Sequence, residues 1–236
     1  MTNGNTDFDE NTLLEAELFA DPEDISSRTG VPAVVVKRLP RYYRYLRELI
    51  LAEKLRVSSG ELSRMLGVTA SQIRQDFNCF GDFGQQGYGY NVRFLYRKIS
   101  EILGVTKGYN AVIVGSGNLG RALAGSHMFA KRGVNLLGLF DVSPDVIGSV
   151  VSGYRVMPIS DAPDFCRENG VSIAVLTTPG DAAAAAARMF VDAGVRGIWN
   201  FTNKELDIPQ PGVKTENVHM GDSLMMLCYS LSEGEE

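Results

Sequence analysis

Residues 111–141 read AVIVGSGNLGRALAGSHMFAKRGVNLLGLFD, and this stretch decides the fold of the C-terminal part of the chain. Residues 111–114 form the short apolar run that is typical of a buried parallel strand. The pattern G-x-G-x-x-G follows at residues 115–120, then a helical pattern as far as Gly133 and a second apolar strand that ends on Asp141. Strand, glycine pattern, helix, strand and acid in this order predict a Rossmann-like unit.

Each part of this pattern has a physical role in holding a dinucleotide. Gly115 permits a tight turn, Gly117 lets the backbone approach a pyrophosphate, and Gly120 lets the helix pack close to the strand. Asp141 follows Gly120 by 21 residues and can accept hydrogen bonds from adenosine ribose hydroxyls. The alternatives are a glycine turn without a ligand and a site for another nucleotide. The predicted dinucleotide site comprises Gly115, Ser116, Gly117, Asn118, Leu119, Gly120 and Asp141.

The rest of the C-terminal part predicts a doubly wound parallel sheet. Further strands are expected at residues 154–157, 173–176, 197–200 and 217–220, with helices at 161–168 and after Asp181. Strand ends meet at one edge of such a sheet, where the ribose and nicotinamide would lie. The residues expected there are Thr177, Thr178, Pro179, Asn200 and Phe201. For Phe201, packing in the core is an equal alternative.

Charge is distributed unevenly along the chain, although the net charge is only −5. Residues 1–27 carry eight acids and no base, residues 28–104 carry 13 Lys and Arg against 6 acids, and residues 105–236 carry 10 against 14. A basic block between acidic ones favours an anionic partner, with a solvated charged face as the alternative. We expect an acidic, poorly ordered tail over 1–30, a DNA-binding domain over 31–104 and a nucleotide-binding domain over 105–236.

Composition excludes several classes of protein. No run approaches the roughly 18 apolar residues of a membrane helix. The polar, acidic N-terminus is unlike a secretory signal. Cysteines are few, scattered and without metal-ligand spacing, so we expect a reduced cytoplasmic setting and no metal site; they are Cys79, Cys166 and Cys228.

The basic block contains a helix-turn-helix pattern. Ser58 with Glu61, and Thr69 with Gln72, have the spacing of capping boxes that open two short helices, expected at about 60–66 and 70–80. Gly67 provides the turn between them. A helix expected at about 41–55 precedes the pair, and another at 91–103 follows it.

The second of these two helices has two different faces. Ile73, Phe77 and Phe80 should face the core, and the opposite face is polar and not acidic, as a recognition helix in a major groove requires. The alternative is a solvated face on an interaction helix. Residues 81–90 form a glycine-rich aromatic hairpin, which we interpret as the wing of a winged helix. Candidate DNA contacts are Ser58, Ser59, Thr69, Ser71, Gln72, Arg74, Gln75, Asn78, Gln85, Gln86 and Tyr88.

Several segments together resemble the Rex family of redox-sensing repressors. They are SQIRQDF at 71–77, GQQGYGY at 84–90, VGSGNLG at 114–120, VLTTP at 175–179, GIWNF at 197–201 and the tail from Asn217. The resemblance covers residues 32–231 in order. It implies a winged helix joined to a Rossmann domain that binds NADH or NAD⁺. It further implies a homodimer whose C-terminal helix packs across to the partner, and the release of DNA when NADH binds. The final helix, from Asp222 to about Leu231, is too apolar for an exposed end, so we expect a symmetric dimer on an inverted-repeat operator.

The sequence departs from the family pattern at five positions. Gln75, Gln85 and Gln86 stand where family members often have basic residues, so fewer DNA contacts by charge are implied. Ser126 stands where a family tyrosine lies near the nicotinamide, and His219 where an acid links the domains in some members.

Two functions from other classes compete with a repressor. A dehydrogenase needs a general acid or base beside the nicotinamide and a substrate-binding segment. The only histidines are His127 and His219, and neither has an evident acidic partner. No segment remains for a substrate. We therefore do not expect this protein to be an enzyme. A sensor of another nucleotide, such as coenzyme A, is the second alternative, against which Asp141 favours an unphosphorylated adenosine ribose.

Overall fold

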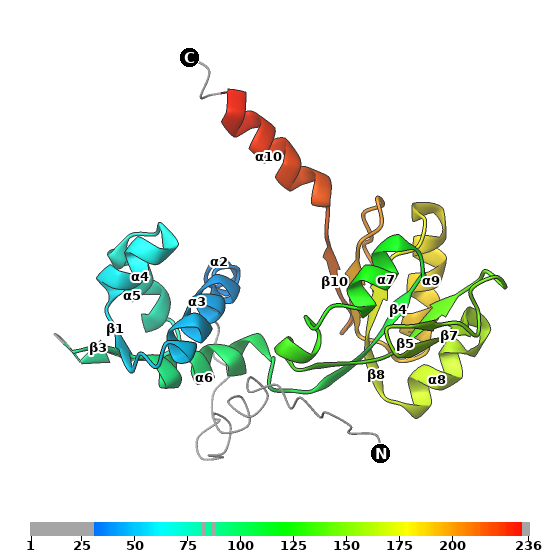
Figure 1. The fold of residues 1–236 in the computed structure, drawn as a ribbon, viewed down its shortest axis with the longest axis horizontal. Coiled ribbons are helices and arrows are strands. Elements are labelled where there is room, and N and C mark those ends of the chain that lie inside the picture. The colour runs from blue at the N-terminus through cyan, green and yellow to red at the C-terminus, as the bar shows by residue number, and fades with distance from the viewer. Residues whose placement is uncertain (1–30, 82–83, 86–87, 233–236) are drawn as a thin grey trace, which may run out of the picture. The chain divides into compact units, whose positions relative to one another are not determined.

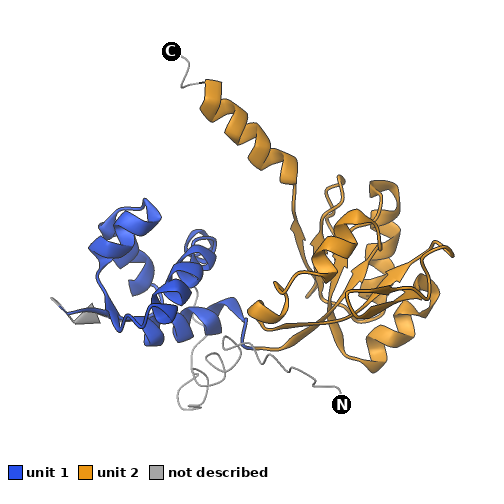
Figure 2. Cartoon of the chain, viewed as in Figure 1, with its two compact units in different colours: residues 1–106 blue, residues 107–236 orange. Residues whose placement is uncertain are grey.

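The chain divides into two compact units, residues 1–106 and 107–236, in a computed structural model that describes residues 31–81, 84–85 and 88–232 (Figures 1 and 2). The predicted acidic tail over 1–30 and the predicted contact Gln86 lie outside the described residues, as does the side chain of Gln85. Within the described ranges, no helix has the length and apolar character needed to cross a membrane.

Unit 1 is a helical bundle with a small sheet. Its elements are α2 (Ala33–Val36), α3 (Leu39–Leu51), β1 (Arg56–Val57), α4 (Ser59–Leu66), α5 (Ala70–Asn78), β2 (Gly84–Gln85), β3 (Gly89–Asn91) and α6 (Val92–Leu103). The strands form an antiparallel sheet of order β1-β3-β2, in which β2 and β3 are the predicted wing. Buried apolar side chains from α3, α4, α5 and α6 make one core, so the expected winged helix is confirmed.

The helix boundaries of unit 1 follow from local hydrogen bonds. Ser58 and Glu61 form the full capping box that their spacing predicts. Gly67 then ends α4 in the left-handed conformation, with a φ of 64°. The second predicted capping box is only half present: Thr69 Oγ1 accepts from the Gln72 amide at 3.2 Å, but the Gln72 side chain turns away to another partner. Helix α3 ends four residues earlier than expected because Glu53 adopts a φ of 54°.

Unit 2 is built on a seven-stranded sheet of order β10-β9-β8-β4-β5-β7-β6, parallel except for the β6–β7 pair. Its elements are β4 (Tyr109–Val114), α7 (Asn118–Ala124), η1 (Ala130–Arg132), β5 (Val134–Asp141), β6 (Val150–Val151), β7 (Tyr154–Pro158), η2 (Ile159–Asp161), α8 (Ala162–Glu168), β8 (Val171–Leu176), α9 (Gly180–Asp192), β9 (Gly197–Asn200), β10 (Lys214–Asn217) and α10 (Met220–Ser232).

Both faces of this sheet are covered, which explains why its central strands are uniformly apolar. Along β4, Val112 and Val114 belong to one core with α8 and α9, whereas Ile113 belongs to a second core with α7. Chain order reverses at β4, which has β5 on one side and β8 on the other. The expected doubly wound α/β sheet is confirmed, and its switch point lies where such sheets bind ligands.

The main differences from expectation in unit 2 concern α7, α9 and the last strand. Helix α7 ends at Ala124, and a short 3-10 turn carries the chain to Gly133, because Gly125 caps the helix and weak helix formers follow it. Asp181 lies in the first turn of α9 rather than at its cap, which is Pro179. The last strand spans Lys214–Asn217, three residues before the expected range of 217–220.

Candidate functional site

The predicted glycine pattern follows β4 and lies at the carboxyl ends of β4, β5 and β8. Gly115 has a φ of 99°, and a Cβ there would lie 2.9 Å from the Thr177 carbonyl oxygen. A Cβ on Gly120 would lie 2.0 Å from the Gly115 carbonyl oxygen, closer than any real contact. A Cβ on Gly117, in contrast, would meet nothing within 4 Å. Packing therefore requires two of the glycines, while the third leaves open space beside the start of α7.

Asp141 is held at the end of β5 by four hydrogen bonds. Its Oδ2 accepts from the Ser116 amide at 2.6 Å and from the Ser116 hydroxyl at 2.7 Å. Its Oδ1 accepts from the amides of Val142 and Ser143 at 2.8 and 2.9 Å. Burial alone would raise the pKa of Asp141, but these hydrogen bonds outweigh it and hold the pKa below its ordinary value. The carboxylate is thus charged and suited to accept a ribose hydroxyl in place of the Ser116 hydroxyl.

Two threonines follow β8 at the same edge. Thr177 joins the two strand ends, since its amide donates to the Val114 carbonyl at 2.8 Å and its hydroxyl lies 2.8 Å from the Gly115 carbonyl. The Thr178 hydroxyl is buried and has no hydrogen-bond partner among the described residues. A buried hydroxyl without a partner is costly, so this atom is free to donate a hydrogen bond to a group bound beside it. Pro179 follows it as the exposed cap of α9.

Asn200 has a different place from the one that the sequence predicts. It is fully buried, and its Nδ2 donates to the Lys204 carbonyl and to Asn217 Oδ1, both at 2.7 Å. Its Oδ1 accepts from the amide and the hydroxyl of Thr202. Asn200 therefore supports the turn after β9 and does not line the predicted nucleotide site, which corrects that expectation. Phe201 is half-buried, with its ring 4.6 Å from the Trp199 ring.

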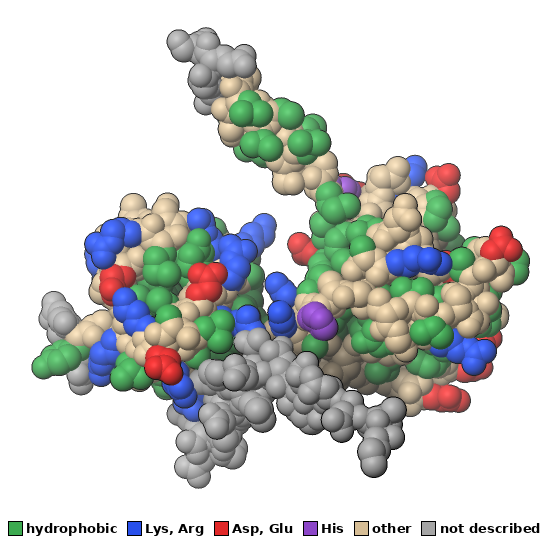
Figure 3. All heavy atoms as spheres, in the orientation of Figure 1, with side chains coloured by type: hydrophobic (Ala, Val, Ile, Leu, Met, Phe, Trp, Pro, Cys, Tyr) green, Lys and Arg blue, Asp and Glu red, His purple; other side chains and the backbone are tan. Residues whose placement is uncertain are grey.

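The polar face predicted for α5 is present and exposed, and Ile73 and Phe77 on the other side are buried. Arg74 binds serine hydroxyls of both α4 and α5. Its Nη1 donates to Ser59 Oγ and its Nη2 to Ser71 Oγ, each at 3.1 Å. Figure 3 shows Lys and Arg side chains on the visible face of this unit. The exposed face of α5 comprises Ser71, Arg74, Gln75 and Asn78.

The remaining predicted DNA contacts have mixed roles. Ser58 and Thr69 are exposed, but each hydroxyl accepts the hydrogen bond that caps a helix. Tyr88, at the wing, is 70% exposed. The Arg56 guanidinium lies 5.9 Å from its ring centroid and donates to its carbonyl at 3.3 Å. The sequence did not single out Arg56, because a strand as short as β1 has no periodic pattern.

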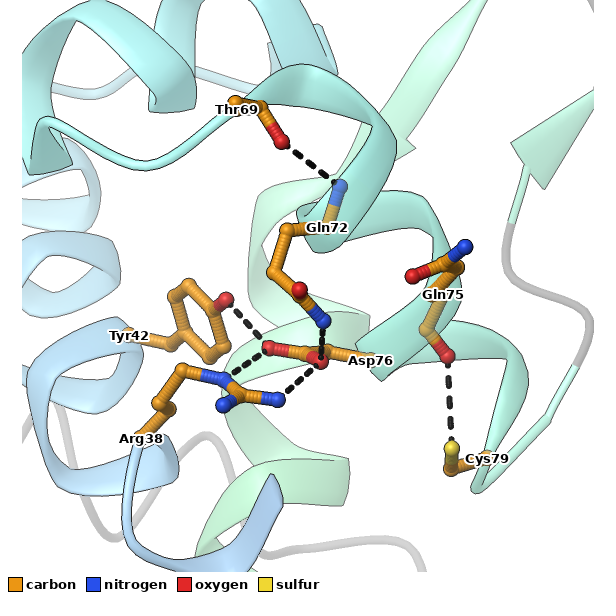
Figure 4. Close-up of polar contacts among 7 residues, drawn as sticks. All are labelled: Arg38, Tyr42, Thr69, Gln72, Gln75, Asp76 and Cys79. Atoms are coloured by element: carbon orange, nitrogen blue, oxygen red, sulfur yellow. Dashed lines mark hydrogen bonds and ion pairs between the residues drawn. The ribbon is translucent and has the colours of Figure 1, made fainter. Parts of the chain in front are cut away.

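A buried polar group also escaped the sequence-based prediction. Asp76 lies on α5 and is 1% exposed, and it accepts hydrogen bonds from Arg38, Tyr42 and Gln72 (Figure 4). An acid at i+3 from Ile73 falls on the apolar face of α5, and that position was the available signal. Among the described residues, no group of three or more His, Cys, Asp or Glu side chains is placed to hold a metal ion.

Each unit matches a known protein family. The family described as "Putative DNA-binding protein N-terminus" matches residues 30–78, and the one described as "CoA binding domain" matches residues 106–204. Redox-sensing transcriptional repressor Rex of Caldicellulosiruptor saccharolyticus is 48% identical over 206 residues, 87% of this chain and 94% of that protein. The protein of the same name from Clostridium perfringens is 44% identical, over 89% of this chain and 99% of its own.

Solved structures of a Rex-family repressor are also similar to this chain over most of its length. The crystal structure of RSP in complex with β-NAD⁺ and operator DNA has a TM-score of 0.81 and 48% identity, and it covers 88% of this chain and 95% of the other. The structure of RSP in complex with β-NADH has a TM-score of 0.80 and 45% identity, over 88% of this chain and 97% of the other. RSP is described as a Rex-family repressor.

Proposed function

The chain belongs to the Rex family of redox-sensing transcriptional repressors, and we propose that it represses transcription by binding operator DNA and leaves that DNA when it binds NADH. The main observation in support of this function is that the chain matches Rex repressors over nearly its whole length. It has both of the expected units, the DNA-binding unit first and the nucleotide-binding unit second. A winged helix supplies the DNA contact, and a Rossmann-like unit supplies the nucleotide contact. The protein thereby senses the ratio of NADH to NAD⁺.

The nucleotide is assigned to the carboxyl ends of β4, β5 and β8 in unit 2, within a domain over residues 105–236. The backbone of residues 115–120 holds the pyrophosphate, above the open space at Gly117. Asp141 accepts from the adenosine ribose, and Thr178 donates its unpaired hydroxyl to the ligand. The nicotinamide reports the redox state because it is neutral when reduced and cationic when oxidised. Apolar surroundings at Phe201 favour the neutral form, since a desolvated charge is costly.

The DNA is assigned to unit 1, within a domain over residues 31–104. Helix α5 enters the major groove with Arg74 and Gln75 toward the bases or phosphates. The wing follows the backbone with Tyr88, and Arg56 beside it adds a positive charge that was not foreseen. Ser58 and Thr69 present helix N-termini, which favour a phosphate. Because its proposed partner is operator DNA, the protein must be in the same compartment as the chromosome. We therefore propose a cytoplasmic location.

A homodimer on an inverted-repeat site is the third part of the proposal. Every residue of α10 is exposed, including Leu224, Met225 and Leu227. Such an apolar surface marks an interface, because a single chain that left it uncovered would aggregate. NADH is proposed to stabilise a dimer geometry that cannot span both DNA half-sites.

A coenzyme A sensor is the second candidate, favoured by the family match over residues 106–204. Coenzyme A carries a 3′-phosphate on its ribose, which the charged Asp141 would repel. Thermal unfolding with NADH, NAD⁺, NADPH and coenzyme A separates the two, because only a bound ligand raises the midpoint. We propose that the chain is not an enzyme: His127 and His219 are both exposed, and the described residues outside the winged helix and the Rossmann-like sheet form no further domain that could bind a substrate.

Fluorescence anisotropy with the duplex that the protein selects from a random pool tests the DNA assignment. Arg74→Ala should weaken binding by about 1–3 kcal/mol, as expected for a contact to a base or a desolvated phosphate. Arg93→Ala is the matched control, because Arg93 is an exposed arginine on α6 and its loss changes the net charge equally. Equal losses in the two variants would remove Arg74 from the interface.

A further inference from the structure

The centre of α5 contains a fully engaged buried acid. Asp76 Oδ2 accepts from Arg38 Nε at 2.7 Å and from the Tyr42 hydroxyl at 2.6 Å. Asp76 Oδ1 accepts from Arg38 Nη2 at 2.6 Å and from Gln72 Nε2 at 2.9 Å. Figure 4 shows the four side chains converging, and we call Arg38, Tyr42, Gln72 and Asp76 the anchor network.

The network is electrostatically balanced. Burial would raise the pKa of Asp76, but the hydrogen bonds from Arg38, Tyr42 and Gln72 outweigh it and keep the pKa below its ordinary value. Burial, together with the bond to Asp76, raises the pKa of Tyr42, so that its hydroxyl stays a donor. The acid is therefore charged, and Arg38 neutralises a negative charge that would otherwise oppose DNA phosphates near α5.

The geometry of the network fixes one helix against another. Arg38 and Tyr42 are four residues apart at the start of α3, and Gln72 and Asp76 are four residues apart on α5. The Arg38 guanidinium donates one hydrogen bond to each carboxylate oxygen of Asp76. Such a bidentate pair fixes the relative orientation of the two helices as well as the distance between them. Helices α3 and α5 also share the apolar core of unit 1, in which the Tyr42 and Phe77 ring centroids lie 5.2 Å apart. An apolar contact is non-directional and by itself allows a helix to slide or rotate.

The face of α5 opposite the network is the exposed one. Because successive residues of an α-helix are about 100° apart, a rotation of α5 by only part of that angle would already turn Arg74 and Gln75 away from the direction in which they now point. Readout of bases requires side chains to be placed closely, so the orientation of α5 is a condition for specificity.

Building on the proposed function, we propose that Arg38 and Asp76 are positioning residues for DNA readout, which hold α5 in the rotation that presents its exposed face to the groove. They govern the preference for operator over other DNA. The general attraction to DNA does not depend on them, since it arises from charge spread over the unit.

The test compares operator DNA with a scrambled duplex of the same length, at one salt concentration, for three variants of the full chain. Asp76→Asn removes the charge with little change in size, Arg38→Lys keeps the charge but loses the fork, and Tyr42→Phe removes one donor. We expect the operator preference to fall about tenfold or more for Asp76→Asn and Arg38→Lys, the loss of about one base contact. Affinity for the scrambled duplex should stay within about twofold. NADH affinity should be unchanged in all three.

Ile99→Val is the matched control, because Ile99 is fully buried in the same core, on α6, and outside the network. It should lower the thermal midpoint and leave the operator preference intact. An equal fall in preference for this control, or no fall in folded Arg38→Lys and Asp76→Asn, would overturn the inference. If Asp76→Asn does not fold, Arg38→Lys decides. A wild-type protein without any operator preference would instead contradict the proposed function itself.

Discussion

Asp141 and Ser116 are the two residues on which the proposed choice of nucleotide depends. The carboxylate is charged and already accepts four hydrogen bonds, two of them from Ser116. In the proposed complex a ribose hydroxyl takes the place of the Ser116 hydroxyl, while the backbone amides keep the carboxylate in position. Such an arrangement accepts a hydroxyl and repels a phosphate at the same point.

Asp141→Asn should weaken NADH binding by about 1.5–3 kcal/mol, the usual size of a hydrogen bond to a charged group. It should also reduce the preference for NADH over NADPH, because the repulsion of a 2′-phosphate is lost. Isothermal titration with both nucleotides measures the two effects. Ser116→Ala is the control, since it removes only the competing hydroxyl and should leave NADH affinity equal or higher. An unchanged NADH preference in Asp141→Asn would show that another residue selects the ribose.

The glycine loop at residues 115–120 and helix α7 pack closely at Gly120 and leave open space at Gly117. Gly120→Ala would place a Cβ against the Gly115 carbonyl, whereas Gly117→Ala would place one in open space. We expect Gly120→Ala to destabilise unit 2 by about 1–3 kcal/mol or more, as overpacking does. Gly117→Ala should keep the thermal midpoint but weaken NADH binding, because the methyl group occupies the space of the pyrophosphate. Full NADH affinity in Gly117→Ala would place the pyrophosphate elsewhere.

Periodic elements of this fold were predictable from the sequence. The two faces of α5, the Ser58 cap and the order of strand, glycine loop and acid all follow from local spacing, and the structure has them. Asp76 was overlooked because its partners, Arg38 and Tyr42, lie 38 and 34 residues away. No local pattern signals such a pairing.

Short and irregular elements were predictable only in part. Strands β1 and β6 have two residues each and therefore no period. The break of α7 at Gly125 depends on a cap that the periodic apolar pattern concealed. Asn200 was assigned to the ligand from its place at a strand end. Its burial depends on Asn217, from a strand that joins the sheet beside it.

The exposed helix α10 determines the oligomeric state that we expect for the protein. Deleting residues 221–236 should convert a dimer into monomers or aggregates, because the apolar side chains of α10 are expected to pack on a second subunit. Analytical ultracentrifugation at micromolar concentration measures this. Deleting only residues 233–236 is the control and should leave the dimer intact. A stable monomer of the full-length protein would contradict the dimer.

The proposed redox switch requires that the two ligands, operator DNA and NADH, affect each other's binding. Because linkage is reciprocal, operator DNA must weaken NADH binding by the same factor by which NADH weakens DNA binding. The most direct measurement is a fluorescence titration of NADH with and without saturating operator duplex. We predict that the duplex raises the Kd for NADH by roughly 5–150-fold, which corresponds to about 1–3 kcal/mol of coupling. Equal NADH affinities in the two titrations would contradict the redox switch, even if the protein binds both ligands.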